Sequence, residues 1–389
     1  MLQPDYFDGK ADKLIAYYQK LEDWILQDIA RRLLKAQSMT ATADRLVYSL
    51  EQMGLHKNEI LKKLSSITGK TTAEIKSLLQ DAVLTSWNDE RAVYLTQGIA
   101  LSNPLENKEI MRLMDAEWRK VQGEIDNLTR TTIAESGNQI VTLLNEAEMR
   151  VSSGAQSYSQ AIIDVLDQYA GQGIMVDYPS GARRSIEAAV RCAVVTSMNQ
   201  TAAQLSNAYI KEHGIEYVYV SEHLGARHDK KNPTGVSSHD YWQGKVYKID
   251  GSEPGYPNLL ESTGYDIDEN GNGHVVNPLG LHGYNCRHSH QGWYKDLKVP
   301  EKRFTDEESQ KRYELSQQQR AMERSIRKTK RRILVKQEEI NAVAETDVKD
   351  ILESDLKAMN KKLARQSEEY NKFCQDNGLV AQYDRLHTY

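Results

Sequence analysis

The chain has 389 residues, of which 39% are hydrophobic, and a formal net charge of −5 at pH 7. This length favours two or three domains, and the mild negative charge gives no overall signature of nucleic-acid binding. No stretch approaches the roughly 20 apolar residues of a membrane span, and the first residues lack the segments of a signal peptide. Three scattered cysteines do not make a disulfide framework, so we expect synthesis in a reducing cytoplasm.

The N-terminal part predicts a series of helices. Apolar residues recur at three- and four-residue steps from Leu14 to Ile29, which is typical of an amphipathic helix. Shorter helices are predicted from about 42 to 53 and from about 58 to 68, each followed by a glycine. Residues 71–74 have the Thr-x-x-Glu pattern of a capping box, so they predict the start of another helix.

Further helices lead to a proline-rich window. Asn103-Pro104 marks a break, and the apolar spacing from Ile110 to Leu128 predicts a long helix after it. Helical patterning resumes from 137 to 170, and a strand candidate at 175–178 precedes a Pro-Ser-Gly turn. Another long helix is predicted from 185 to 213, ended by Gly214. Because four of the eight prolines fall between 230 and 280, the window from His213 to His290 cannot be helical throughout.

Two strands are predicted inside the window, at 216–220 and 246–249, where β-forming residues are concentrated. Residues 266–273 carry acidic and asparagine side chains at the spacing of a calcium-binding loop. The bidentate acid that such a loop needs would be residue 277, which is Asn, and no flanking helices are predicted. We therefore interpret this segment as a solvated turn.

The segment after Pro300 predicts charged helices. Leu315, Met322, Ile326, Ile333 and Ile340 form a heptad-like stripe. Ten lysines and arginines lie between 311 and 336, and residues 338–355 lean acidic, which favours an antiparallel hairpin paired by charge. A basic helix can bind nucleic-acid phosphates or an acidic partner, or it can be a solvated coiled-coil flank. The residues that would make such DNA or partner contacts are Arg324, Arg327, Lys328, Arg331 and Arg332.

The window also holds eight of the ten histidines and one of the three cysteines. Imidazole and thiolate are the ligands that zinc prefers. Against this, no Cys-x-x-Cys pair is present, and most histidines in proteins bind no metal. The density of these residues therefore indicates a metal site without deciding for it.

Four short segments of the window recur in a recognisable order: VSEHLGAR at 220–227, HDYWQGKVY at 239–247, TGY at 263–265 and GLHGYNCRH at 280–288. Together they resemble the minor capsid protein 2 family of tailed phages and prophages, which is similar to the Mu F-like head morphogenesis proteins. The resemblance covers roughly residues 175–336. It includes the helix segment 190–196 before the window and the basic segment 319–328 after it.

The sequence departs from the family pattern at two loops. Residues 229–238 lengthen the link between the first two segments, and His228 stands where the family pattern has proline. Residues 266–277 lengthen a second link. Both read as surface insertions, and they leave open whether His223 or His228 faces the centre of the motif.

The resemblance implies a non-enzymatic component of the phage head, made in the host cytoplasm and carried in the virion. It implies the portal and major capsid proteins as partners, and it implies neither a membrane nor a small-molecule substrate. Packaged DNA is a further partner if the basic helix binds it.

A structural zinc ion in this motif would be held by His239, Cys286 and His288, with His223 as the fourth ligand. Cys-x-His places two ligands in one tight turn. The alternative is that His239 and Cys286 only pack inside a small domain. Further motif residues with structural roles are Arg227, Trp242, Gly244, Asn285 and Arg287, and the two arginines would bind backbone carbonyls or acids.

A metal-dependent nuclease or hydrolase is the rival interpretation of the same window. His239, Asn285 and His288 can be drawn as a His-Asn-His arrangement, but their spacing and the lack of a second metal-binding pair argue against it. Glu222 and Asp240 adjoin proposed ligands, yet sequence neighbours rarely face one ion, so neither is an evident general base.

These observations predict an α+β protein in three parts. Residues 1–172 form a helical region for assembly contacts, and 173–300 form a small mixed α/β motif domain with the Cys and His residues. Residues 301–389 form a basic coiled helix or a helical hairpin.

Overall fold

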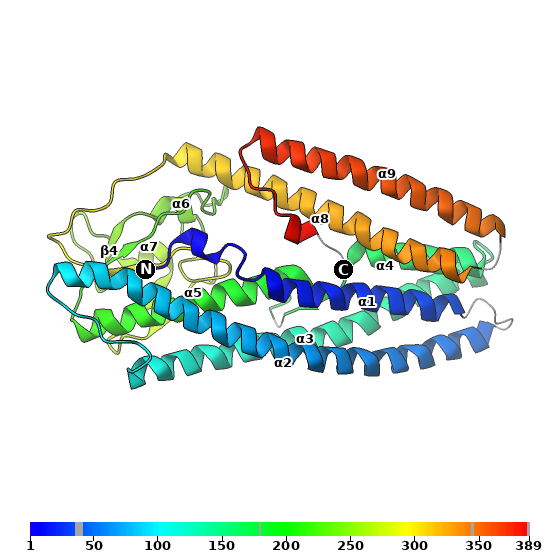
Figure 1. Ribbon diagram of the computed structural model, residues 1–389, viewed down its shortest axis with the longest axis horizontal. Helices are drawn as coiled ribbons and strands as arrows, with labels where there is room; N and C mark the ends of the chain where they lie inside the picture. Colours follow the sequence, from blue (N-terminus) through cyan, green and yellow to red (C-terminus); the bar gives the residue numbers. More distant parts are fainter. Residues whose placement is uncertain (36–41, 179, 344–345, 387–389) are drawn as a thin grey trace. The chain divides into compact units, whose positions relative to one another are not determined.

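The computed structural model describes residues 1–35, 42–178, 180–343 and 346–386. Within these ranges long helices dominate, accompanied by three small antiparallel sheets (Figure 1). The predicted α+β class with a mostly helical N-terminal region is therefore confirmed.

The N-terminal helices are longer and fewer than the sequence predicted. They are the short 3₁₀ helix η1 (Pro4–Phe7), α1 (Asp12–Lys35), α2 (Thr42–Thr96), α3 (Lys108–Ser152) and α4 (Tyr158–Gln172). The break at Asn103-Pro104 is confirmed, because it lies in the connection between α2 and α3.

The predicted division of residues 42–96 into separate helices was wrong, since α2 runs through both glycines and through the predicted capping box. A buried stripe explains why the helix continues past Gly69. Ile60, Leu64, Thr71, Ile75 and Leu79 follow one another at helical spacing and are all buried. A glycine in an otherwise periodic helix costs only about 1 kcal/mol, which a continuous buried face offsets.

Replacing Gly69 by alanine is expected to stabilise the protein by about 0.5–1 kcal/mol. Gly69 is exposed within α2, and a Cβ there meets no atom within 4 Å. Gly98 is the matched control. It also has open space around it but has a φ of +71°, so alanine there is expected to destabilise the fold. Urea denaturation of both variants checks this, and equal effects of the same sign would contradict it.

The central part of the chain alternates short strands with helices. Its elements are β1 (Met175–Asp177), β2 (Arg183–Ser185), α5 (Ile186–Glu212), β3 (Tyr217–Val220), α6 (His239–Trp242), β4 (Val246–Lys248), α7 (Leu259–Thr263), β5 (Tyr265–Ile267), β6 (Gly273–Val275) and β7 (His290–Trp293). The strands predicted at 175–178, 216–220 and 246–249 are confirmed within one residue at each end. The sequence did not predict β2, β5, β6 or β7.

Strand β3 is the middle strand of the sheet β4-β3-β7, and both of its neighbours are antiparallel to it. Strands β5 and β6 form a separate hairpin. Its turn is the segment that has calcium-loop spacing. There the Asp268 carboxylate accepts hydrogen bonds from the backbone N–H groups of Asn270 and Asn272 at 2.9 and 2.8 Å. The interpretation of this segment as a turn is confirmed.

The chain forms two compact units, each built from three segments. Unit 1 contains residues 1–11, 71–125 and 191–317, and unit 2 contains residues 12–70, 126–190 and 318–389. The three-part division with limits at 172 and 300 stays a prediction.

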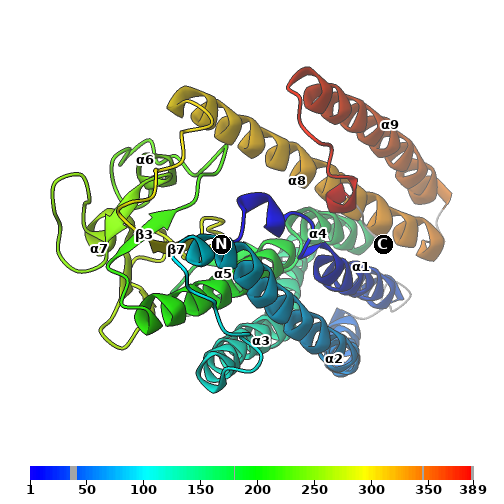
Figure 2. The same cartoon turned by 60° about the vertical axis from the view of Figure 1, so that its left-hand side comes forward.

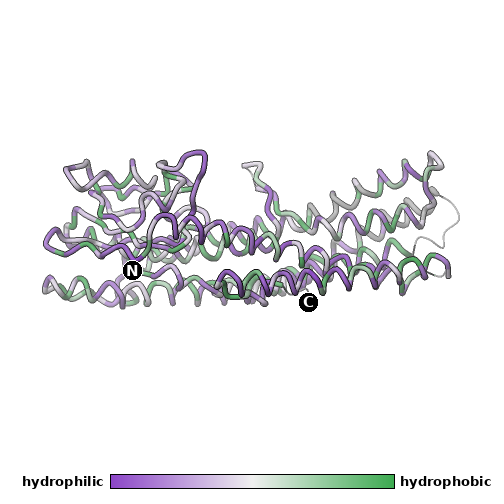
Figure 3. Tube along the Cα trace, turned by 90° about the horizontal axis from the view of Figure 1, so that it is seen from above, coloured by the Kyte–Doolittle hydropathy of each residue, from purple (hydrophilic) through white to green (hydrophobic). Residues whose placement is uncertain are grey.

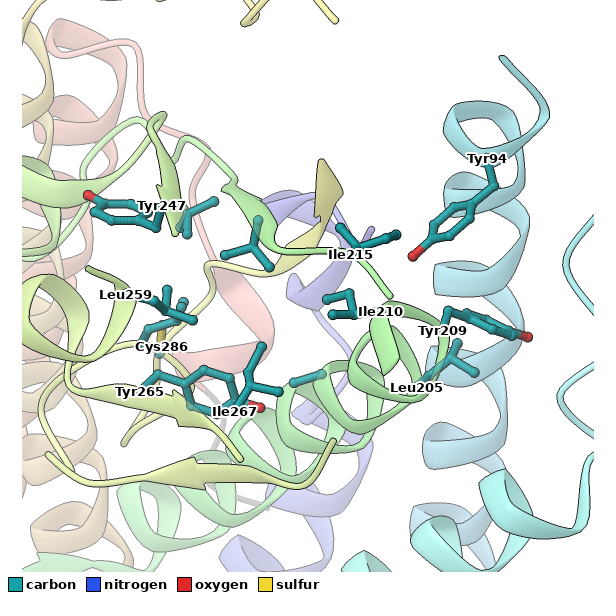
Figure 4. Close-up of a cluster of buried hydrophobic side chains, with 14 of the residues drawn as sticks. Tyr94, Leu205, Tyr209, Ile210, Ile215, Tyr247, Leu259, Tyr265, Ile267 and Cys286 are labelled. Atoms are coloured by element: carbon teal, nitrogen blue, oxygen red, sulfur yellow. The ribbon is translucent and has the colours of Figure 1, made fainter. Parts of the chain in front are cut away.

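The core of unit 1 joins the sheet to α5 and to part of α2. Figure 4 shows buried side chains of this core, including Tyr94 on α2, Tyr209 and Ile210 on α5, and Tyr247 on β4. Cys286 lies in the same cluster. One apolar core therefore joins α2 and α5 to the strands and loops of the predicted motif.

Helix α8 (Asp306–Ala342), whose residues from 318 onward belong to unit 2, and α9 (Thr346–Asp376) run side by side as a hairpin, followed by the short helix η3 (Tyr383–Leu386) (Figure 1). The predicted hairpin is confirmed, and its two helices are joined by polar contacts between uncharged and charged side chains. Gln319 on α8 donates to the Tyr370 hydroxyl on α9 at 3.2 Å, and that hydroxyl donates to Glu323 at 3.2 Å. The ion pairs of Arg327, Arg331 and Arg332 join α8 to α5, α1 and α4.

Hydrophilic and hydrophobic residues are interspersed along the long helices, as Figure 3 shows. No helix in the described ranges has the length and apolar content that crossing a membrane requires.

Candidate metal centre

Helix α5 positions the candidate site through amide side chains that bind the backbone of the window. The Asn199 amide donates to the carbonyl oxygens of Cys286 at 2.8 Å and of His288 at 3.0 Å. Gln200 donates to the His282 carbonyl at 2.9 Å, and Gln204 donates to the Gly273 carbonyl at 3.2 Å. Figure 2 shows α5 beside the strands and short helices of this region. The helix therefore fixes the path of the loops that carry the histidines and the cysteine.

The loop before β7 is a succession of tight turns. His282 and Asn285 both have a positive φ, 58° and 55°. Asparagine tolerates this conformation better than most residues, which gives the predicted motif residue Asn285 a backbone role. At Gly283 a Cβ would lie 2.3 Å from the Pro278 carbonyl oxygen, so only glycine fits there. These turns bring Cys286 and His288 to the same point.

The structure brings together three of the four predicted ligands. His239 on α6, Cys286 and His288 each offer a ligand atom, and these atoms all lie within 4.8 Å of one another. Cys286 Sγ lies 3.7 Å from His288 Nδ1. The three residues are 2%, 0% and 1% exposed, so this is an enclosed site.

The other ring nitrogen of each histidine is already bonded. His239 Nε2 donates to the Leu279 carbonyl at 2.7 Å, and His288 Nε2 donates to Gln243 Oε1 at 3.0 Å. A histidine that ligates a metal commonly donates its second ring N–H to such an acceptor, which fixes the tautomer and the ring orientation. The arrangement leaves Nδ1 of both rings for a ligand.

Trp242 closes one side of the site. Its ring centroid lies 4.5 Å from that of His239 and 4.9 Å from that of His288, and its Nε1 donates to the Val236 carbonyl at 2.9 Å. Gly244 follows with a φ of +67°, and a Cβ there would lie 2.7 Å from the Glu222 side chain. Trp242 therefore has a packing role, and Gly244 has a backbone role that requires glycine.

His223, and not His228, faces this centre. The His223 ring packs edge-on against His288 with 5.8 Å between centroids. His228 Nδ1 instead lies 2.7 Å from the Asp240 carboxylate. The sequence left open which of the two histidines faces the centre, and the contact of His228 with Asp240 decides for His223.

The two motif arginines bind backbone carbonyl groups and a carboxylate, as the sequence predicted. Arg227 donates to the carbonyl oxygens of Leu279 at 2.9 Å and of Tyr284 at 2.6 Å. Arg287 pairs with Asp8 at 2.7 Å. These contacts hold the Cys-x-His loop from outside and take no part in the trio itself.

Burial controls the protonation of the trio. Burial lowers the pKa of His239 to about 3, with the Arg227 charge acting in the same direction. Burial also holds the pKa of His288 well below its usual value and raises the pKa of the Cys286 thiol to about 11. At neutral pH the site therefore presents neutral imidazoles, the form that ligates metals, beside a thiol that ionises only when a nearby cation compensates it.

Sequence reasoning missed a second polar cluster. His282 and His290 are joined by a 2.8 Å hydrogen bond, and His282 Nδ1 lies 3.0 Å from Asn199 Oδ1. His290 Nε2 lies 2.8 Å from Asn207 Oδ1, and the Asn207 amide donates to the Tyr265 hydroxyl. The available signal was the set of amide residues at 199, 200, 204 and 207 in a helix segment, 192–210, that has no charged residue.

The predicted DNA-contact residues lie on α8 and are not part of this centre. Arg331 pairs with Glu22 at 3.5 Å and Arg332 with Asp167 at 3.1 Å, while Arg327 pairs with Glu187. Arg324 and Lys328 are exposed. Three of the five cations thus have carboxylate partners within unit 2.

The family model described as "Phage minor capsid protein 2" matches residues 2–374. A protein described as "Structural protein", from Lactococcus phage LL-H, is 24% identical over 372 residues, which cover 92% of this chain and 91% of that protein. No solved structure matches the chain.

The family match spans both compact units and includes every residue of the buried trio. The resemblance seen in the four window segments is therefore confirmed and extends well beyond them. The chain belongs to the phage minor capsid protein 2 family.

Proposed function

We propose that the protein is a structural component of the phage head that contacts the portal and the major capsid protein during head assembly. The observation that carries this proposal is the family match over residues 2–374. The similarity to a phage structural protein over nearly the whole of both chains supports it. A virion location follows from the same relationship.

The geometry of the buried trio favours a structural role over the hydrolase alternative. A catalytic metal keeps an open position for water or substrate. His239, Cys286 and His288 are at most 2% exposed, and Trp242 packs on both rings. An ion at this position would therefore be shielded from any large substrate.

Contact with packaged DNA is supported less well than contact with protein. Of the five predicted cations, Arg327, Arg331 and Arg332 are in ion pairs, which reduces their attraction for phosphates. Steeply salt-dependent, sequence-independent binding would be the signature of a DNA role.

Quantitative mass spectrometry of gradient-purified heads tests the proposal, with the portal protein as the counting standard. We expect the protein in the particles at a fixed ratio to the portal. Crosslinking in the same particles is expected to join it to the portal or to the shell. Absence from the heads, with the protein soluble in the lysate, would overturn the structural role.

A further inference from the structure

We propose that His239, Cys286 and His288 bind one structural zinc ion, with His223 as the fourth ligand. This site is independent of the head-assembly role and stands on the geometry of unit 1.

The spacing of the trio fits tetrahedral zinc. With Zn–S of about 2.3 Å and Zn–N of about 2.0–2.1 Å, the sulfur and nitrogen ligands of a tetrahedral ion lie about 3.6 Å apart. Cys286 Sγ and His288 Nδ1 are 3.7 Å apart. The ligand atom of His239 lies within 4.8 Å of both. Small side-chain movements then bring all three atoms to bonding distance.

The surroundings of the ligands are those of a built metal site. Leu279 O and Gln243 Oε1 accept from the Nε2 atoms of His239 and His288, which leaves both Nδ1 atoms for a metal. Gln243 Oε1 also accepts from the backbone N–H of His223 at 2.7 Å. One side chain therefore orients a ligand of the trio and anchors the segment that carries the fourth.

His223 is the fourth ligand that the packing favours. Its ring contacts that of His288, and the residue is only half-buried, so it lies on the more open side of the site. Asp240 is the other candidate, but His228 and Gln310 hold its Oδ2, and its carboxylate is not grouped with the three ligand atoms. A set of two or three histidines and one cysteine is a ligand chemistry that zinc accepts.

Such an ion would connect segments far apart in the sequence. His223 follows β3, His239 is on α6, and Cys286 and His288 precede β7. Because the unfolded chain has no preformed site, metal binding contributes directly to the stability of the folded state. The ion would thus cross-link these short elements and stabilise the fold, as a disulfide does in secreted proteins.

Metal analysis of the full-length protein, purified without chelator after growth in zinc-supplemented medium, tests the proposal. We expect about one equivalent of zinc per chain, which is lost in Cys286→Ser and kept in Cys192→Ser. Cys192 is the matched control because it is also a buried cysteine of unit 1 but lies on α5. Zinc in the Cys286→Ser protein at the wild-type level would overturn the site.

Cobalt substitution keeps the test decisive if Cys286→Ser does not fold. Wild-type protein loaded with Co²⁺ is expected to show a thiolate-to-cobalt charge-transfer band and the visible bands of tetrahedral coordination. A folded wild-type protein that binds neither zinc nor cobalt, or binds cobalt without the thiolate band, would overturn the proposal.

The fourth ligand is tested separately with His223→Gln. Even a residue that only orients a ligand changes zinc affinity by 10–100-fold, so loss of this ligand is expected to weaken zinc binding by at least about tenfold. His274→Gln, at an exposed histidine of the same unit, is the control. Equal affinities of the two variants would remove His223 from the ligand set.

Discussion

Replacing Asn199 by leucine is expected to lower the free energy of unfolding by about 3–5 kcal/mol. The Asn199 amide donates to the carbonyls of Cys286 and His288, and its oxygen lies 3.0 Å from His282 Nδ1. Leucine keeps the branched shape of asparagine, but its methyl groups cannot form hydrogen bonds and need more room than the amide atoms. Three buried polar groups would each lose a partner, at about 1–3 kcal/mol apiece. The urea midpoint of the full chain measures the effect.

Ser197→Ala is the matched control for Asn199→Leu. Ser197 is also a buried polar residue of α5, but its hydroxyl donates only to the Val194 carbonyl of its own helix, at 2.9 Å. We expect a change of about 1 kcal/mol or less. If both variants unfolded at the same urea concentration, the amides of α5 would not be the contacts that hold the Cys-x-His loop.

The zinc-ligand hypothesis could be formed from the sequence because its residues are chemically distinctive. The Cys286-x-His288 pair and the HDYWQG segment stand out by residue type, and the structure brings them together. Helices with a sustained apolar stripe, such as α1 and the first part of α3, could be predicted for a similar reason. Burial of one face determines them, and that face is visible in the spacing.

The contacts that position the site could not be predicted in the same way. Asn199 is 87 residues away from Cys286, and its side chain resembles that of any solvent-exposed amide in a helix. Strand β7 was missed because a four-residue segment containing Gln291 and Gly292 carries almost no β-strand signal. Its pairing with β3 is decided by the core around it, which local patterns do not contain.

The errors in α2 and in the C-terminal hairpin have a common cause. In both places the prediction rested on local sequence signals, whereas contacts with residues distant in the sequence determine the structure. Gly69 and the capping-box pattern at 71–74 suggested an end to α2, but a buried stripe continues through them. The acidic stretch 338–355 suggested partners for the α8 cations, but the partners of Arg327, Arg331 and Arg332 lie on α5, α1 and α4.

Replacing Arg327 by methionine is expected to lower the free energy of unfolding by about 3–5 kcal/mol. Arg327 is 7% exposed, pairs with Glu187 and donates to the Arg385 carbonyl at 2.6 Å. Methionine preserves much of the side-chain volume but leaves the Glu187 carboxylate without this guanidinium. Breaking a buried ion pair on one side costs about that much.

Arg324→Met, one turn earlier on the exposed face of α8, is the control and is expected to change stability by less than about 0.5 kcal/mol. Urea denaturation followed by the helical circular dichroism signal compares the two variants. The comparison also separates two roles for the basic helix. If Arg327 serves DNA contact, Arg327→Met would unfold like Arg324→Met and lose salt-dependent DNA binding. If it serves the fold, stability falls, and any DNA binding depends on the exposed cations, among them Arg324.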